Sequence, residues 1–211
     1  MEYKMNNIKY LEHISAVPGR EMILARIGYK KDKTVLDERN TKMIDEGIRT
    51  GELLCNVRGA YGRFGIVDRS ESHIKLMNGV IFKSENLSKL LSMSSEVVLM
   101  ASTAGKDVVE RISREINSGN AAFGVILDSV ASQTADAGLN WLSNFLNKIL
   151  SREGRKLTKH RYSPGFGDLP LSYQRVIFEL LGLGKLDMEL TDSFMLMPEK
   201  SVIAIAGVEE A

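Results

Sequence analysis

The longest helical pattern in the chain runs from about Asn120 to Leu150, and it limits how the remaining residues can be arranged. Apolar and small side chains recur there at steps of three or four, which is the spacing of one helix face. The small residues in the first half of the pattern allow another element to approach closely. The residues on this face are Ala131, Ala135, Gly138, Leu142, Phe145 and Ile149.

Strand patterns occur on both sides of this helix. From Val57 to Val67 the apolar residues alternate, and three interspersed glycines favour a twisted or bulged strand. The Asn78-Gly79 pair is the strongest short hairpin signal, and it joins residues 73–77 to residues 80–83. Further strands are predicted at Glu96–Thr103, Phe194–Met197 and Ser201–Gly207, the last two joined by residues 198–200.

Shorter helices are predicted at 21–28, 36–54, 107–117 and 173–181, with one more short helix after the N-cap residue Ser84. Residues 1–35 are expected to form a helical lead-in. No repeat or linker divides the chain. We therefore predict one α+β domain over residues 1–211, in which a mostly antiparallel twisted sheet packs with the long helix and several shorter helices.

The composition argues against several classes of protein. Lys and Arg number 28 and Asp and Glu number 27, so the net charge of +1 creates no field that attracts nucleic acid. The single cysteine, Cys55, excludes an internal disulfide and a cysteine-rich zinc site. No apolar run approaches the roughly 20 residues that span a bilayer, and the charged N-terminus lacks the apolar core of a secretory signal. We expect a cytoplasmic protein that binds neither nucleic acid nor membranes.

Familiar catalytic motifs are missing from the sequence. It contains no GxSxG nucleophile elbow, no Walker P-loop and no HExxH pair. The histidines His13, His73 and His160 have no metal-ligand neighbour at a useful spacing. The sequence therefore favours a binding function with few titratable groups over a self-contained hydrolase or metalloenzyme.

The most unusual stretch of the chain is Arg161–Ser172, with the sequence Arg-Tyr-Ser-Pro-Gly-Phe-Gly-Asp-Leu-Pro-Leu-Ser. Glycines without Cβ let a backbone approach a ligand, and Pro164 restricts the residue before it. These features predict a rigid, exposed loop with bare N–H groups and one guanidinium. The alternative is an ordinary Pro-Gly turn that follows a solvated basic run.

Three polar residues recur at a spacing of four on the long predicted helix, namely Asp128, Ser132 and Asp136. They project from one side of that helix. A solvated polar face opposite the core is the alternative to a binding role. Trp141, on the same helix, is expected to be a partly buried packing residue.

The Arg161–Ser172 stretch resembles the reactivation domain of cobalamin-dependent methionine synthase, in its free-standing short form. In that family an Arg-x-x-Pro-Gly-aromatic motif lies in the S-adenosylmethionine site. Residues 190–207, which read Leu-Thr-Asp-Ser-Phe-Met-Leu-Met-Pro-Glu-Lys-Ser-Val-Ile-Ala-Ile-Ala-Gly, resemble the closing pair of strands of the same domain. The two stretches lie in roughly the last fifty residues, and the order of the earlier elements is compatible with this domain.

The resemblance implies roles for six residues. Arg161 would bind the methionyl carboxylate, and Asp136 would bind the ammonium. Ser163 and Gly165 would offer main-chain contacts beside Pro164, and Phe166 would form an apolar wall.

The chain also departs from the family pattern. Phe166 stands where the family often has tyrosine, so it has no hydroxyl to donate. Arg155 stands where the full-length members have an acidic residue, and Val202 and Ile203 stand where they have aromatic residues.

The function that this resemblance implies is S-adenosylmethionine binding for reductive remethylation of cobalamin. No Asp-x-His-x-x-Gly corrinoid motif occurs in the chain, so the cobalamin would be carried by a partner, either a corrinoid protein or a truncated methionine synthase acting in trans. A reducing protein such as flavodoxin would be a further partner. The alternatives are an interaction or chaperone module that does not use S-adenosylmethionine, and a nucleotide binder that uses the basic run from Arg152 to Arg161.

Overall fold

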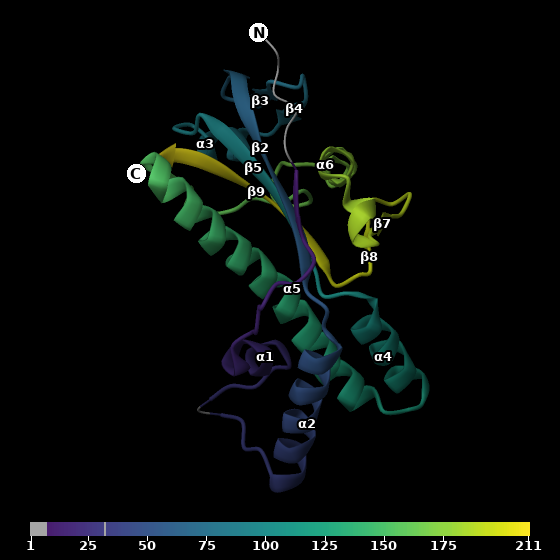
Figure 1. Cartoon of the computed structure of the whole chain (residues 1–211). Coiled ribbons are helices and arrows are strands. Elements are labelled where there is room, and N and C mark those ends of the chain that lie inside the picture. Colours follow the sequence, from purple (N-terminus) through teal and green to yellow (C-terminus); the bar gives the residue numbers. More distant parts are fainter. Residues whose placement is uncertain (1–7, 32) are drawn as a thin grey trace.

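The long helix α5 (Ala121–Leu150) runs along one side of a curved sheet in the computed structural model, as Figure 1 shows. Its C-terminal half packs on the strands through Leu139, Leu142, Leu146 and Leu150. Its N-terminal half continues beyond the sheet, where three helices surround it. These are α1 (Arg20–Arg26), α2 (Glu38–Leu54) and α4 (Lys106–Asn117).

In the part of the chain that the structure describes, the main sheet has seven strands, and each of its pairings is antiparallel. The strand order is β4-β3-β2-β5-β9-β6, and β1 pairs with β2 beside this path. This architecture confirms the predicted α+β fold. The strands are β1 (Lys9–Leu11), β2 (Arg58–Arg69), β3 (His73–Leu76), β4 (Ile81–Lys83), β5 (Glu96–Thr103), β6 (Arg155–Leu157) and β9 (Ser201–Glu210).

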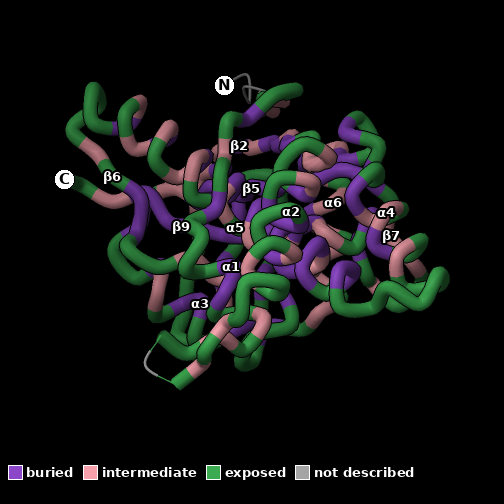
Figure 2. The backbone as a smooth tube through the Cα atoms, turned by 90° about the horizontal axis from the view of Figure 1, so that it is seen from below, coloured by how far each residue is buried: buried purple, intermediate pink, exposed green. Residues whose placement is uncertain are grey.

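Both faces of the central strand β5 are covered, which explains its unbroken apolar run. Val98 and Met100 point toward α5, whereas Val97 and Leu99 belong to the core on the opposite face. That second core is covered by α3 (Glu85–Leu90) and α6 (Tyr173–Leu181). Figure 2 accordingly shows long buried stretches along the central strands and exposed residues in the outer loops.

Local turn chemistry follows the sequence closely. Gly79 has φ +88° in the β3–β4 hairpin, as expected for the Asn-Gly turn. The predicted bulge lies in β2 between Ile66 and Asp68. The Ser84 side chain accepts a hydrogen bond from the Leu87 N–H and so caps α3.

The expected helical lead-in is only partly helical. The structure describes residues 8–31 and 33–211, so the first seven residues of this prediction and residue 32 lie outside the described residues. Within the described part, β1 comes before α1 because Lys9–Leu11 pairs with Gly59–Tyr61 of β2. The Tyr10 hydroxyl then donates to the Leu181 carbonyl at 2.8 Å, which fixes the strand against the end of α6.

The two strands predicted at the end of the chain exist, but they belong to different sheets. β8 (Leu196–Met197) pairs with β7 (Glu189–Leu190) in a separate two-stranded sheet, while β9 lies between β5 and β6. In residues 8–31 and 33–211, no helix combines the length and the apolar character needed to cross a membrane.

Gly138 sets how closely α5 lies on the sheet. A Cβ added at this position would meet the Ser102 Oγ on β5 at 2.0 Å and the Val57 Cγ1 at 3.1 Å. Ser102 is fully buried, and its Oγ has no hydrogen-bond partner among the described residues. Gly138 thus serves the approach of the sheet, whereas Gly124 in the first half of α5 lies against Ile112 and Ile116 of α4.

We predict that Gly138→Ala lowers the free energy of unfolding by about 1–3 kcal/mol, because the added methyl overpacks this contact. Ser102→Ala alone should be neutral or stabilising, since it removes a hydroxyl that is buried without a partner. Denaturant unfolding of both single variants and the double variant measures the coupling. Additive effects would contradict this account, because Ser102→Ala should recover part of the loss.

Candidate functional site

A hollow of about 590 Å³ lies between one face of α5 and the irregular segment Ser15–Gly19. We call it the Arg161 hollow. It is lined by Gln133, Asp136, Ala137, Asn140, Trp141 and Asn144 of α5, and by Met22 and Arg161 from other parts of the chain.

The segment Ser15–Gly19 is held at both of its ends. The Ile14 N–H donates to the Val57 carbonyl at 2.9 Å, and the Ile14 side chain is buried in the core between α5 and the sheet. After Gly19 the chain enters α1, where the Ile23 carbonyl accepts a hydrogen bond from the Ser129 hydroxyl of α5 at 2.9 Å. The wall of the hollow opposite α5 is therefore fixed in place.

Arg161 is oriented by two acceptors on α5. The Nη2 atom donates to the Asn140 Oδ1 at 2.9 Å, and the Nη1 atom donates to the Ser143 Oγ at 3.0 Å. The next residue, Tyr162, exchanges backbone hydrogen bonds with Ile205 of β9. The Arg161 side chain is thus held by α5, and the backbone of the next residue is held by β9.

Asp136 brings an opposite charge to the same hollow. It lies one helical turn before Asn140, and its side chain is exposed. Burial lowers the pKa of the Arg161 guanidinium, and the Asp136 carboxylate acts in the opposite direction. The guanidinium stays charged at neutral pH, since arginine does not deprotonate in proteins.

The spaced polar residues of α5 therefore have different surroundings. Asp128, two turns before Asp136, forms an ion pair with the Lys200 ammonium at 2.6 Å. Asp128 is thus a partly exposed residue whose carboxylate pairs with the ammonium just before β9. Asp136 instead faces a hollow.

The other four residues that the resemblance implicates do not line the Arg161 hollow. Pro164 is buried, and the Ser163 hydroxyl donates to the Ile203 carbonyl at 2.7 Å. Gly165 has φ +90°, and the Phe166 side chain is 68% exposed. Of the six predicted site residues, the structure brings Arg161 and Asp136 together and leaves the Ser163–Phe166 turn apart from them.

Two of the N–H groups of this loop that were expected to be bare are occupied. The Gly165 N–H donates to the Leu169 carbonyl at 2.8 Å, and the Phe166 N–H donates to the Ser163 carbonyl at 3.2 Å. The cause is the tightness of the turn, which brings backbone carbonyls within reach of these donors. The expectation of a rigid loop agrees with these bonds, but that of open donors at Gly165 and Phe166 is wrong.

Asp168 anchors the loop to α3, a role that the sequence analysis missed. Its carboxylate accepts hydrogen bonds from the Ser84 hydroxyl and the Glu85 N–H, both at 2.6 Å. These bonds, that from Ser84 above all, lower the pKa of Asp168 to about 2. The sequence marks Ser84 as an N-cap residue, but it does not show that the Ser84 hydroxyl donates to Asp168, which is 84 residues away.

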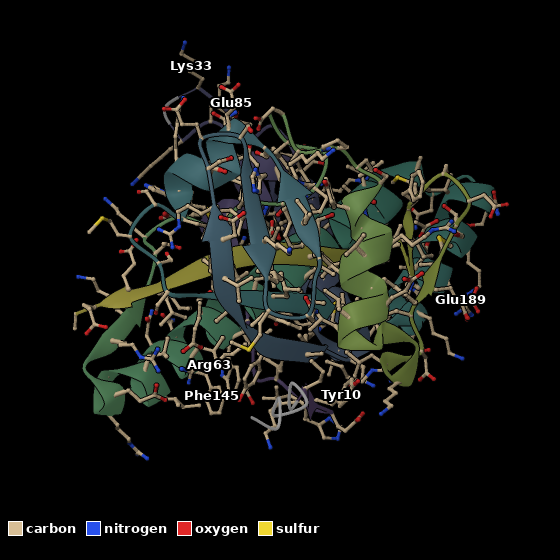
Figure 3. All side chains as sticks on the ribbon, turned by 90° about the horizontal axis from the view of Figure 1, so that it is seen from above. Tyr10, Lys33, Arg63, Glu85, Phe145 and Glu189 are labelled. Carbon is tan, nitrogen blue, oxygen red and sulfur yellow. The ribbon has the colours of Figure 1, made fainter. Side chains whose placement is uncertain are left out.

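Arg155, which departs from the family pattern, belongs to an ion-pair network away from the hollow. Its guanidinium bonds Glu153 and also donates to Glu96 at 2.6 Å. Arg63 of β2 bonds the same two carboxylates, at 2.8 Å to Glu96 and 2.9 Å to Glu153. The bonds from Arg63 and Arg155 lower the pKa of Glu153 to about 2. Figure 3 labels Arg63 and, on α5, Phe145.

A second hollow of about 520 Å³ adjoins the first and shares Asn140, Asn144 and Arg161 with it. Lys159 and His160 also line it, together with Ser143, Asn147, Leu157 and Thr158. The basic run is therefore divided, because Arg155 faces carboxylates while Lys159 lines a hollow.

The described residues contain no group of three or more His, Cys, Asp or Glu side chains that could hold a metal ion. Burial raises the pKa of the Cys55 thiol to about 11, so the thiolate is disfavoured. Cys55 packs at the end of α2 against two hydrophobic clusters, as expected for a small apolar residue.

Comparison with known proteins relates the chain to solved structures rather than to known sequences. No protein-family model and no curated protein sequence matches it. Its structure resembles the crystal structure of the MetH reactivation domain bound to AdoHcy, with a TM-score of 0.69 over 97% of this chain and 79% of that chain. The chain has the fold of the MetH reactivation domain. The sequence identity is 15%, and the match confirms the fold implied by residues 161–172 and 190–207.

We predict that Asp168→Asn weakens the anchoring of the loop and destabilises the protein at neutral pH. Because folding lowers the pKa of Asp168 from 3.8 to about 2, its stabilisation is fully present above 3.8 and is lost as the pH falls to about 2. Denaturant unfolding at several pH values should therefore show the wild type and the variant converging at the acidic end.

Asp192→Asn is a matched control, because Asp192 is exposed and lies in a different loop. A pH-independent difference between Asp168→Asn and the wild type would contradict this role of the carboxylate.

Proposed function

We propose that the protein binds S-adenosylmethionine in the Arg161 hollow and presents it to a cobalamin carried by a separate protein. The observation that carries the proposal is that the opposite charges of Arg161 and Asp136 line one hollow. The amino-acid end of S-adenosylmethionine has a carboxylate and an ammonium, so it needs one cation and one anion side by side. The fold shared with a domain solved with bound AdoHcy supports the same ligand class.

The guanidinium of Arg161 has donors to spare for a carboxylate. Its hydrogen bonds to Asn140 and Ser143 use two of the five N–H groups of arginine. A carboxylate binds arginine through two parallel N–H donors, which fixes its orientation as well as its position. Because α5 already holds the guanidinium, little further ordering is needed when a ligand binds.

The hollow also suits the ligand in size and in the position of the second charge. Its volume of about 590 Å³ falls within the range of roughly 300–1,000 Å³ that small-molecule sites have. The Asp136 carboxylate would bind the ammonium, and Asn140 lies one helical turn further along the same side.

The role of the chain in this reaction is to position the ligand. Reduced cobalamin on the partner would supply the electron pair for the new bond to the methyl carbon. The electron pair of the broken sulfur–methyl bond would stay on sulfur, which converts S-adenosylmethionine into S-adenosylhomocysteine. A reducing protein such as flavodoxin would supply the electron that reduces the cobalamin beforehand. This chain contributes the position and orientation of the amino-acid end.

A second candidate function is an interaction module for a corrinoid protein that does not use S-adenosylmethionine. It is favoured by Phe166, a large apolar side chain that is 68% exposed on a loop apart from the hollow. Exposed aromatic side chains on fixed loops are common anchors in protein–protein interfaces. The two functions differ in whether the purified protein binds S-adenosylmethionine at all.

We predict that calorimetry detects S-adenosylmethionine binding to the wild type and that Arg161→Ala weakens it by about 1.5–3 kcal/mol, the value of a charged hydrogen-bonded contact. Arg152→Ala is the matched control, since Arg152 is an exposed cation nearby that does not line either hollow. Absence of heat in the wild type, or equal affinity of wild type and Arg161→Ala, would contradict the proposal and favour the interaction module.

A further inference from the structure

The lining of the Arg161 hollow combines two kinds of side chain. Arg161 and Asp136 contribute opposite charges. Ala16, Val17, Met22 and Trp141 contribute apolar surface, and Val17 and Met22 are 73% and 58% exposed. A ligand that fills the whole hollow therefore needs a charged end and a flat or apolar end.

The helical geometry of α5 separates the Asp136 carboxylate from the Trp141 indole. Asp136 and Trp141 are five residues apart, which corresponds to about 140° around the helix axis and about 7.5 Å along it. Asn140 and Ala137 lie between them and form the floor. The charged group and the indole thus stand on opposite rims of one groove.

The Trp141 indole packs against its neighbours, and part of it remains uncovered. One face stacks on Phe145, with ring centroids 5.2 Å apart and an angle of 12° between the planes. Phe145 in turn packs edge-on against Tyr61 of β2 at 6.2 Å. Because Trp141 lines the hollow and Phe145 does not, the hollow meets surface of the indole that Phe145 leaves open.

We propose that Trp141 is the platform on which the adenine of the ligand stacks, while Arg161 and Asp136 hold its other end. This inference rests on the proposed function and adds the residue that recognises the nucleobase. Aromatic side chains bind nucleobases by stacking, and a tryptophan held by its neighbours loses little freedom on binding. Asn144, one helical turn after Trp141, presents an amide of the kind that pairs with the edge of adenine.

The position of Trp141 on the long helix, taken alone, predicts a partly buried packing residue. The structure agrees that the residue is half-buried against the core of α5 and the sheet. The structure also shows that Trp141 lines the Arg161 hollow. This hollow depends on Ser15–Gly19, which lies more than 120 residues earlier in the chain.

The chain offers a direct probe, because Trp141 is its single tryptophan. Adenosine and methionine, the two halves of the ligand, are titrated separately while tryptophan fluorescence is followed. We expect adenosine to change the emission and to bind equally well to the wild type and to Arg161→Ala. Methionine binding, measured by calorimetry, should instead depend on Arg161.

Substitution of Trp141 tests the stacking itself. Calorimetry should show that Trp141→Ala weakens adenosine and S-adenosylmethionine by about 10- to 100-fold, the loss of one stacked base, but leaves methionine unchanged. Trp141→Phe should restore most of the affinity. Equal thermal unfolding midpoints for Trp141→Phe and the wild type would show that the packing on Phe145 is intact.

The outcomes separate this inference from the proposed function. If S-adenosylmethionine binds and depends on Arg161, but Trp141→Ala binds adenosine as the wild type does, the stacking role is wrong and the proposed function stands. If adenosine binds through Trp141 while S-adenosylmethionine shows no dependence on Arg161, the proposed function fails and the nucleobase platform stands. If neither adenosine nor S-adenosylmethionine binds, both are wrong.

Discussion

The packing of α5 on the sheet is the contact on which both the fold and the candidate site depend. Gly138 and the leucines that follow it bring the helix onto β5 and β9, and the opposite side of the same turns carries Asp136, Asn140 and Trp141. The distance between Arg161 and its acceptors is therefore set by the core. A shift of α5 along the sheet would move the floor of the hollow relative to the guanidinium, because Arg161 is fixed through Tyr162 to β9.

Much of the fold could be predicted because its helices and strands have periodic apolar residues and are bounded by turn or cap residues. The apolar run of β5, the Asn-Gly hairpin and the helical spacing of α5 each depend on residues within a short window. The glycines of α2 illustrate the limit of such reasoning. Gly47 and Gly51 weaken an isolated helix, yet the structure places both against α5, where an added Cβ would meet Ile126 at 2.5 Å and Val130 at 2.7 Å. Each of these glycines costs the helix about 1 kcal/mol relative to alanine, and the close packing of α2 on α5 offsets this cost.

The parts that could not be predicted depend on contacts between distant residues. β1 and β6 are three residues each and have too little pattern to identify. Arg155 was interpreted from the family pattern and from the basic run that ends at Arg161, whereas its partners come from β5 and from the turn before β6. The resemblance pointed to Arg161 and Asp136 but not to Trp141, which lines the same hollow, since this hollow exists only when Ser15–Gly19 lies over α5.

A crystal structure of the protein with S-adenosylhomocysteine tests the central claim most directly, because it locates the ligand without relying on activity. The account predicts electron density in the Arg161 hollow, with the carboxylate on the Arg161 guanidinium, the ammonium near Asp136 and the adenine on Trp141. Density beside Phe166 and the Ser163–Gly165 turn, with the Arg161 hollow empty, would contradict it.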